Sequence, residues 1–327
     1  MNSKTPTILL FLLLLAPFLS CEFIIHRMPN PRPTTKNYFS QNQNMENSRG
    51  ELRFIVIGDW GEKGNFFQKQ VASAMDKIIT QKRIDFILTA GDNFYQNGVN
   101  DINDSHFQES FEKIYSASNK IPWYIALGNH DYMGNIQSLI DYSEKNSFWI
   151  FPSPYYSFEK SLTQSKKVLF VVTDTNEFIH FFGFRYRSYM RKEKGITQLN
   201  WMNTILRDNS SQWKIVVGHH PVYSAGDHGD TVPLQSEFLD NLENNGVDLY
   251  FSGHDHDLQF LKNPNKKTHF FISGAGSKVR EMKSNPYSIL AKAEAGFIVV
   301  TLKERDALVQ FIDKDAKEIF RTIIRKN

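Results

Sequence analysis

Short apolar runs that each end near a glycine recur along the chain. The first run occupies residues 52–57 and is followed by Gly58, Asp59 and a segment with helical spacing of apolar residues at 66–79. A run of this kind, closed by a turn residue, is typical of a β-strand. This part of the chain therefore predicts a strand, a loop and a helix in succession.

The same arrangement predicts further strands at residues 85–88, 123–127, 214–217 and 247–251, each followed shortly by a glycine. Helical patterns lie between them, notably at 197–207 and 233–243, so the first two-thirds of the chain indicates an α/β arrangement. Functional groups gather where the carboxyl ends of such strands converge. The glycines therefore mark the expected place of a site.

The two ends of the chain differ from this middle part. Apolar runs at 269–272, 297–302, 308–312 and 319–324 have few helices between them, and they predict antiparallel strands that complete a second sheet. Residues 22–50 are rich in Pro, Asn, Gln and Ser and predict a flexible leader. Residues 1–21 combine Lys4 with an apolar run too short to span a bilayer, which indicates a secretory signal peptide with an undefined cleavage point.

Composition narrows the classes of protein that fit. With 327 residues, 41% of them hydrophobic and 22% charged, residues 51–327 can bury one sizeable core as a single domain. The net charge of +3 is spread without a long basic run, so nucleic acid is not an expected partner. Cys21 is the single cysteine, which leaves no internal disulfide. Asn103 and Asn209 fit the glycosylation acceptor pattern that secretion would expose.

The residues that follow the glycines include carboxylates, a phenol, an amide and imidazoles. They are Asp59, Asp92, Tyr95, Asn129, His219, His254 and His256. One Gly-Asp or Gly-His pair alone is typical of an ordinary turn. Oxygen and imidazole ligands gathered at five converging strand ends instead indicate a site for two cations. Four of the ten histidines, namely His26, His106, His180 and His269, lie elsewhere and are expected to be surface or packing residues.

In order and spacing, these motifs resemble those of the purple acid phosphatases, within the calcineurin-like metallophosphoesterases. The motifs are Gly-Asp-Trp-Gly, Gly-Asp-Asn-Phe-Tyr, Gly-Asn-His-Asp, Gly-His-His-Pro and Gly-His-Asp-His. The resemblance is strongest to the small, mammalian-type tartrate-resistant enzymes and covers nearly everything from Leu52 onward. It implies two packed mixed β-sheets flanked by helices, a four-layer sandwich, in a catalytic domain of residues 51–327.

The resemblance also implies a role for each candidate residue. Asp59, Tyr95 and His256 are expected to bind Fe³⁺, Asn129, His219 and His254 to bind a divalent ion (Fe²⁺, Zn²⁺ or Mn²⁺), and Asp92 to bridge the two. The phenolate of Tyr95 is a hard anionic donor suited to Fe³⁺. His130, His220 and His228 would surround these ligands, and His130 or His228 would give a proton to the leaving group.

The expected activity is acid phosphatase, acting on small phosphate monoesters or phosphoproteins. Two cations with charges of 3+ and 2+, offset by Asp59, Asp92, the Tyr95 phenolate and one hydroxide, leave about +1 to attract a phosphate dianion. The hydroxide on the metals would attack phosphorus in line. The resemblance to the small enzymes favours a monomer, and the signal peptide favours a secreted or lysosomal enzyme without a stable membrane anchor.

Two other functions remain open at this point. A calcineurin-like phosphodiesterase with Mn or Zn is disfavoured by Tyr95, because relatives that use those metals lack a tyrosine ligand there. A non-catalytic iron- or phosphate-binding relative is disfavoured because no expected ligand is missing. The chain departs from the mammalian-type enzymes in having no cysteine pair for their disulfide.

A basic segment at 184–194 carries Arg185, Arg187, Arg191, Lys192 and Lys194 against the single acid Glu193. It is expected to be a solvated loop before a helix that begins near Thr197. By position it resembles the exposed loop that lies over the active site in mammalian-type enzymes. Its alternative roles are a lid over the active site or a docking surface for acidic phosphoproteins.

Overall fold

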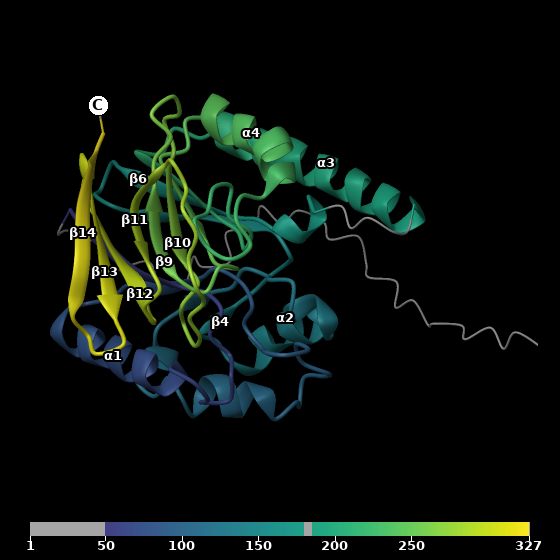
Figure 1. Ribbon diagram of the computed structural model, residues 1–327, viewed down its shortest axis with the longest axis vertical. Helices are drawn as coiled ribbons and strands as arrows, with labels where there is room; N and C mark the ends of the chain where they lie inside the picture. The colour runs from purple at the N-terminus through teal and green to yellow at the C-terminus, as the bar shows by residue number, and fades with distance from the viewer. Residues whose placement is uncertain (1–49, 180–184, 327) are drawn as a thin grey trace, which may run out of the picture. The chain divides into compact units, whose positions relative to one another are not determined.

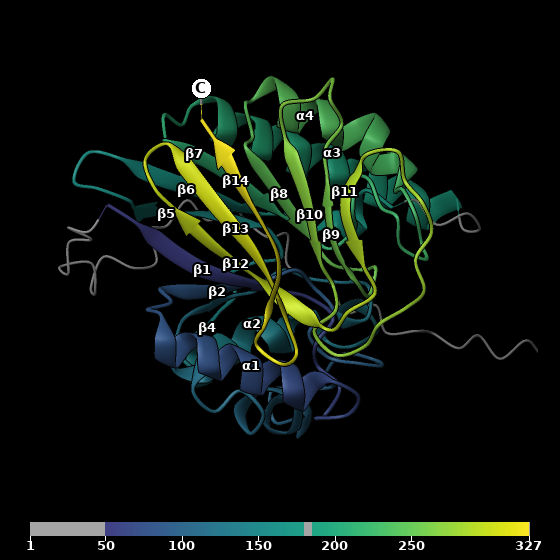
Figure 2. The ribbon, with the colours of Figure 1, turned by 60° about the vertical axis from the view of Figure 1, so that its left-hand side comes forward.

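Two seven-stranded mixed sheets lie at the centre of the structure, a computed structural model that describes residues 50–179 and 185–326. Helices cover the outer face of each sheet, and Figures 1 and 2 show the resulting layers. The expected fold of two packed mixed sheets flanked by helices, a four-layer sandwich, is confirmed. The proposed signal peptide and nearly all of the leader lie outside the described residues.

The first sheet has the order β14-β13-β12-β1-β2-β3-β4. Its strands β1 to β4 are parallel, and β12 joins β1 in antiparallel register, with Leu52 opposite Leu302. The bounds are β1 Leu52–Ile57, β2 Phe86–Thr89, β3 Trp123–Tyr124, β4 Trp149–Ile150, β12 Gly296–Leu302, β13 Asp306–Asp313 and β14 Glu318–Arg325.

The second sheet has the order β11-β9-β10-β8-β7-β6-β5. Strands β6, β7, β8 and β10 are parallel, whereas β5, β9 and β11 are antiparallel to their neighbours. The bounds are β5 Tyr156–Ser161, β6 Lys167–Val172, β7 Trp213–Val217, β8 Leu249–Ser252, β9 Leu258–Leu261, β10 His269–Ser273 and β11 Ser288–Lys292.

Helices α1 Gln68–Gln81 and α2 Ile136–Lys145 lie on the side of the first sheet, and α3 Arg185–Arg207 and α4 Leu239–Asn244 lie on the side of the second (Figure 1). Shorter helical segments connect them, with π-helical turns at Phe107–Glu112 and Leu234–Phe238 and 3₁₀ turns at Ser118–Lys120, Asp131–Met133 and Thr175–Glu177. Among the described residues, no helix has both the length and the apolarity needed to cross a bilayer.

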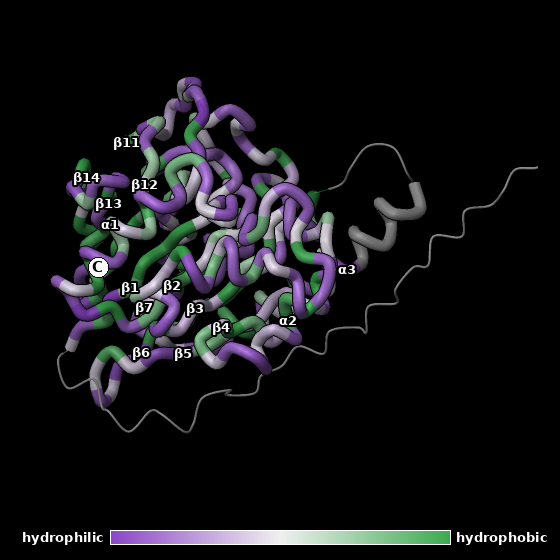
Figure 3. Tube along the Cα trace, turned by 90° about the horizontal axis from the view of Figure 1, so that it is seen from below, coloured by the Kyte–Doolittle hydropathy of each residue, from purple (hydrophilic) through white to green (hydrophobic). Residues whose placement is uncertain are grey.

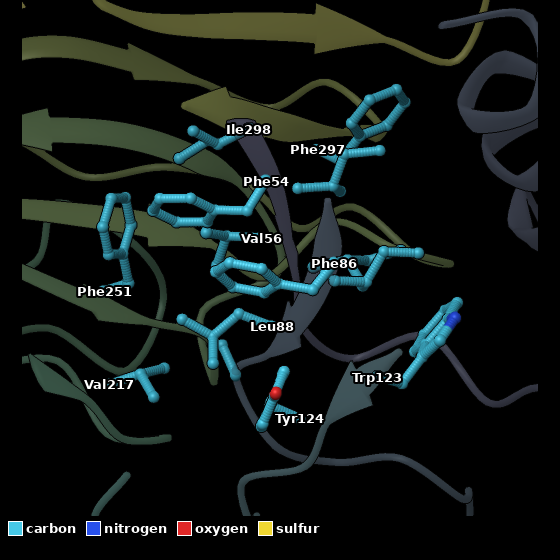
Figure 4. Close-up of a cluster of buried hydrophobic side chains, with 14 of the residues drawn as sticks. Phe54, Val56, Phe86, Leu88, Trp123, Tyr124, Val217, Phe251, Phe297 and Ile298 are labelled. Atoms are coloured by element: carbon cyan, nitrogen blue, oxygen red, sulfur yellow. The ribbon is translucent and has the colours of Figure 1, made fainter. Parts of the chain in front are cut away.

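Side chains from both sheets meet in a shared aromatic core. The ring of Phe54 on β1 lies 5.3 Å from that of Phe170 and 6.2 Å from that of Phe251, both in the second sheet. Figure 4 shows Phe54, Phe86 and Phe251 in this cluster. Such aromatic pairs add about 0.5–1.5 kcal/mol each beyond the burial of their area. They hold the two sheets in register and therefore fix the relation between the loops at their edges.

Alternate residues of the central strands pack on opposite faces. Phe170 belongs to the core between the sheets, whereas its neighbours Leu169 and Val171 pack with Met202 and Leu206 of α3 in a second cluster. Both faces of the strands are thus buried, which accounts for the uninterrupted apolar runs in the sequence. In Figure 3 the tube is largely green along central strands such as β1, and purple predominates in the surrounding loops.

Two expectations about secondary structure are wrong. The runs that became β12, β13 and β14 extend the first sheet beside β1 rather than completing a second one, and only the run at 269–272 joins the second sheet, as β10. The basic segment expected to be a loop is helical, because α3 begins at Arg185 rather than near Thr197. Arginine, lysine, glutamate and methionine are good helix formers, and this preference prevails over the charge pattern.

Candidate metal centre

The seven expected ligands converge at one edge of the sandwich, in loops that follow β1, β2, β3, β7 and β8. The first sheet supplies oxygen ligands and the second supplies nitrogen ligands. Asp59, Asp92, Tyr95 and Asn129 follow strands of the first sheet, and His219, His254 and His256 follow strands of the second. The structure therefore brings together groups that the sequence separates by as many as two hundred positions.

The hydroxyl of Tyr95 lies between two buried carboxylates. Its Oη is 2.8 Å from Asp59 Oδ1, 2.8 Å from Asp92 Oδ2 and 3.1 Å from His256 Nε2. His256 Nε2 is also 3.4 Å from Asp59 Oδ1. These four side chains form the first group of donors, and it is the group expected to hold the ferric ion.

A second group of donors surrounds His219 Nε2. This atom lies 3.1 Å from Asn129 Oδ1, 3.2 Å from His254 Nδ1 and 3.5 Å from Asp92 Oδ2. Asp92 Oδ2 therefore faces both groups, toward Tyr95 on one side and His219 on the other. This is the position expected of a bridging carboxylate.

The backbone holds the remaining oxygen of each carboxylate. The N–H of His254 donates to Asp59 Oδ2 at 2.9 Å, and the N–H of His130 donates to Asp92 Oδ1 at 2.8 Å. One oxygen of each carboxylate is thus fixed, and the other is directed into the site. The backbone thus orients both carboxylates.

Hydrogen bonds alone do not satisfy the oxygen and nitrogen atoms of these two groups. When both carboxylates are ionised, as metal ligation requires, the single hydroxyl proton of Tyr95 cannot serve them both. His219 Nδ1 donates to the carbonyl of Ala90 at 2.9 Å, so Nε2 carries a lone pair that faces the amide oxygen of Asn129. Neighbouring ligands bound at about 2.1 Å and at right angles lie about 3.0 Å apart, which is close to the separations here. The residues fit two cations.

Close approach explains why glycine and ligand recur together in the motifs. A Cβ on Gly128 would lie 2.1 Å from Asp92 Oδ1, and a Cβ on Gly253 would lie 2.3 Å from Asp59 Oδ2. The glycine of one loop therefore leaves room for the carboxylate of another. Sequence reasoning assigned these glycines to turns, and the structure shows that they also make space for the ligands.

Backbone strain is concentrated at the same residues. Asp59, Asp92 and His254 have positive φ angles of 57°, 50° and 71°. This conformation costs a non-glycine residue roughly 1–3 kcal/mol and persists only where the surroundings enforce it. Three of the expected ligands are thus held in conformations that an isolated loop would avoid.

Burial disfavours the charged forms of the titratable side chains at this edge of the sandwich. It raises the pKa of Asp59 to about 8 and raises the pKa of Tyr95 well above its usual range. It likewise lowers the pKa of His254 well below its usual range. Binding of cations by Asp59 and Tyr95 would therefore displace protons from these two side chains.

The three remaining histidines of the motifs surround this centre but differ in their partners. His130 Nδ1 lies 2.6 Å from the carbonyl of Gln96, and its ring lies 4.5 Å from that of Tyr95. A carbonyl only accepts, so Nδ1 carries the proton and Nε2 is left to face outward. His130 is partly exposed, and the backbone of the loop after β2 fixes its ring.

His220 is buried and is held by Thr175. The N–H groups of His219 and His220 donate to Thr175 Oγ1 at 3.2 and 3.0 Å, and His220 Nδ1 lies 2.9 Å from the same oxygen. Because both lone pairs of the hydroxyl are occupied, its proton points to Nδ1. The ring proton of His220 then sits on Nε2, so neutral His220 does not bind a cation, although it lies close to His219 and His254.

His228 stacks on a ligand ring and contacts an arginine. Its ring centroid is 4.2 Å from that of His254, and its Nε2 lies 2.5 Å from Arg280 Nη1. A guanidinium has only donors, so Nε2 of His228 accepts and the ring is neutral. Burial, opposed by Asp255 and reinforced by Arg280, lowers the pKa of His228.

Three residues of the site were not singled out from the sequence. Asp131 lies within the Gly-Asn-His-Asp motif, and Thr175 follows β6, whose apolar run ends in Thr-Asp-Thr at the same edge of the second sheet. The apolar run of β6 before Thr175 is a sequence signal that could have identified Thr175 as a residue of the site. Arg280 lies in the loop after β10, which is parallel to β8, and the apolar run followed by Gly274 is a signal that could have drawn attention to this loop.

Comparisons with known proteins agree with this geometry. Residues 52–258 match the calcineurin-like phosphoesterase family. The chain is 36% identical over 296 residues to purple acid phosphatase 17 of Arabidopsis thaliana, covering 85% of this chain and 84% of the relative. It is 34% identical over 296 residues to tartrate-resistant acid phosphatase type 5 of Homo sapiens, covering 83% of this chain and 90% of the relative.

Among solved structures, GAP50, described as the anchor in the inner membrane complex of Plasmodium, has a TM-score of 0.75. It is 24% identical in sequence, and the match covers 85% of this chain and 90% of that one. At this identity the likeness shows a shared fold.

The fold and the paired donor groups define a metallophosphoesterase, a class whose members work through a binuclear metal centre. The chain belongs to the calcineurin-like phosphoesterase family and, within it, to the purple acid phosphatases. It is an acid phosphatase, a hydrolase of phosphate esters, and the expectation of this activity over a Mn or Zn phosphodiesterase is confirmed.

Proposed function

We propose that the protein hydrolyses phosphate monoesters under acidic conditions at a centre of one ferric and one divalent ion. The observation that carries this proposal is the hydroxyl of Tyr95, held 2.8 Å from an oxygen of each of two buried carboxylates. Phenolate and carboxylate oxygens are hard ligands, which favour a trivalent iron over softer cations. Tyr95, Asp59 and His256 would hold it, and Asp92 would share it with the second ion.

The second ion would be held by Asn129, His219 and His254, with Asp92 as the bridge. A divalent ion suits this group because two imidazoles and an amide add no negative charge to the shared carboxylate. Iron, zinc and manganese all accept such ligands. When bound, the two cations supply an activated water and polarise the phosphoryl group of the ester.

The leaving alkoxide needs a proton, and we assign its donation to His130. The carbonyl of Gln96 fixes the ring through Nδ1 and leaves Nε2 free to carry a second proton toward the substrate. His228 was the other expected donor, but its Nε2 accepts from Arg280. His220 is buried, and burial lowers its pKa well below the usual range, so it stays neutral in acid.

The setting of the enzyme follows from the sequence rather than from the described residues. Residues 1–21 favour entry into the secretory route and a secreted or lysosomal destination. Small phosphate esters or phosphoproteins are then the substrates, and a monomer is the expected state. Asn103 is exposed and is the better glycan acceptor, because the amide of Asn209 donates to Glu159 Oε1 at 2.7 Å.

The test is the visible spectrum and metal content of the purified protein, measured beside its pH profile on an aryl phosphate. Tyr95→Phe should abolish the absorption band, which arises from charge transfer between phenolate and ferric ion, while the fold is retained. Tyr142→Phe is the matched control, since Tyr142 on α2 donates to Glu112 and neither residue belongs to the two donor groups. A Tyr95→Phe protein that keeps its colour would refute the ligand assignment.

A further inference from the structure

A guanidinium lies against the candidate metal centre without a carboxylate of its own. The backbone N–H of Arg280 donates to the carbonyl of His256 at 3.1 Å, and its Nη1 lies 2.5 Å from His228 Nε2. In the part of the chain that the structure describes, no carboxylate pairs with Arg280. Within these described residues the carboxyl of Asp257 is influenced by the charge of Arg280, but no close ion pair holds the guanidinium.

The neighbouring cations on the same segment are used differently. Lys278 is paired with Glu62, and its Nζ lies 4.3 Å from the ring centroid of Phe66 and 5.3 Å from that of Tyr95. Lys283 lies 3.5 Å from Asp227 Oδ1. Both lysines form ion pairs, whereas the guanidinium of Arg280 forms none among the described residues and is able to bind an anionic ligand.

Arg280 is connected to two of the candidate ligands, to His256 through the backbone and to His254 through His228. It bonds to the backbone of His256, and the side chain of His228 to which it donates is stacked on His254. These two histidines are expected to hold different cations. The guanidinium therefore lies at the margin of both donor groups, on the side that is partly open to solvent.

A phosphoryl group offers oxygens that metal ions do not use, and guanidinium recognises them through paired N–H donors. One N–H of the Arg280 guanidinium donates to His228, and its remaining N–H groups can donate to a ligand. We propose that Arg280 binds the phosphoryl oxygens of the substrate and of product phosphate, and that His228 orients it by accepting one N–H. This rests on the proposed function for the position of the metals.

His228 is a positioning residue in this proposal, because it acts through Arg280. The pairing also explains why a histidine so near the centre is not the proton donor. A neutral ring that accepts from a guanidinium can direct the guanidinium, but it has no Nε2 proton to give. Recognition of phosphate and protonation of the leaving group then fall to different residues, Arg280 and His130.

The experiment measures binding of inorganic phosphate to the full-length, metal-loaded protein by calorimetry, together with KM and kcat on an aryl phosphate. Arg280→Gln should weaken phosphate binding and raise KM about 10- to 100-fold, the effect of losing a charge-assisted hydrogen bond. Because substrate and transition state both bear these oxygens, kcat should change much less. Arg280→Lys should lie between.

Arg321→Gln on β14 is the charge-matched control, since Arg321 is exposed and pairs with Glu318. Metal content and the unfolding midpoint of both variants should equal those of the wild type. Equal phosphate affinity in wild type and Arg280→Gln would overturn the proposal, as would loss of metal from Arg280→Gln. A wild type that binds phosphate but does not turn over would instead count against the proposed function alone.

The role of His228 is tested by a double-mutant cycle. His228→Leu should reproduce part of the loss in phosphate affinity, and adding it to Arg280→Gln should cost little more, because both changes remove the same oriented guanidinium. His228→Gln keeps an acceptor and should restore part of the affinity. Fully additive losses would show that His228 acts on the substrate by itself.

Discussion

The side chain of Thr175 fixes the tautomer of His220, one of two adjacent histidines at the candidate metal centre. It takes the backbone N–H groups of His219 and His220 and gives its own proton to the ring of His220. The carbonyl of Ala90 imposes the opposite tautomer on His219. Neighbouring imidazoles thus take different roles, and the difference comes from residues that touch neither cation.

We predict that Thr175→Val destabilises the protein by about 1–3 kcal/mol, because it leaves two buried N–H groups without an acceptor. It should also impair second-metal selectivity, since the tautomer of His220 is no longer fixed. Equilibrium urea unfolding and metal analysis after competitive loading with zinc and manganese measure the two effects. Thr175→Ser keeps the hydroxyl and should behave as wild type; if it fails equally, the methyl group rather than the hydroxyl is responsible.

At the scale of elements, Asp131 joins the loops that follow β2 and β3. Its carboxylate accepts from the backbone N–H of Asn93 at 3.0 Å, of Phe94 at 3.3 Å and of Gly128 at 2.9 Å. The amide of Asn93 adds a fourth bond at 2.8 Å. These loops carry Asp92, Tyr95 and Asn129, so one buried carboxylate sets the distance between the two donor groups.

Asp131→Ala should therefore lower the free energy of unfolding by about 3 kcal/mol or more and reduce the binding of both metals together. Chemical denaturation and metal titration are the measurements. Asp240→Asn, an exposed carboxylate near Lys266, is the control and should change stability by less than about 1 kcal/mol. Loss of a single metal in Asp131→Ala would mean that the loops are held independently.

The sequence predicts elements better than it predicts their neighbours. Apolar runs located β1, β2, β7 and β8 because strands buried on both faces leave a continuous signal. The same signal does not say which strand lies alongside, and β12 pairs with β1 across nearly the whole length of the domain. Likewise the candidate ligands are visible because they follow strand ends, whereas Arg280 lies seven residues beyond the end of β10, and the sequence does not show where the loop between them leads.

At the scale of the whole molecule, acid should lower the stability of the fold through a histidine that is not among the candidate metal ligands. His269 opens β10, and burial lowers its pKa to about 4, with the charge of Lys262 acting in the same direction. The folded state thus favours neutral His269, whose ordinary pKa is near 6.5. Its contribution to stability is complete above pH of about 6.5 and is lost as the pH falls toward 4.

We predict that His269→Leu reduces the acid sensitivity of folding. Between pH 6.5 and 4 the wild type should lose about 2 kcal/mol more than the variant, a figure reduced from the full pKa difference because the ring is partly exposed. Urea unfolding across this range, with the same metal loading, gives the comparison. All other titrating groups are common to both proteins, so parallel curves would show that His269 does not protonate on unfolding.

The division of ligand types between the two sheets has a consequence for how metals enter and leave. The candidate oxygen donors follow strands of the first sheet and the candidate imidazoles follow strands of the second, so each cation of the proposed centre would cross-link the two sheets. Neither half offers a complete set of ligands by itself. On the proposed assignment, complete sites would form only after the two sheets have docked, and we expect the rate of metal loss to rise with motions that separate the two sets of loops.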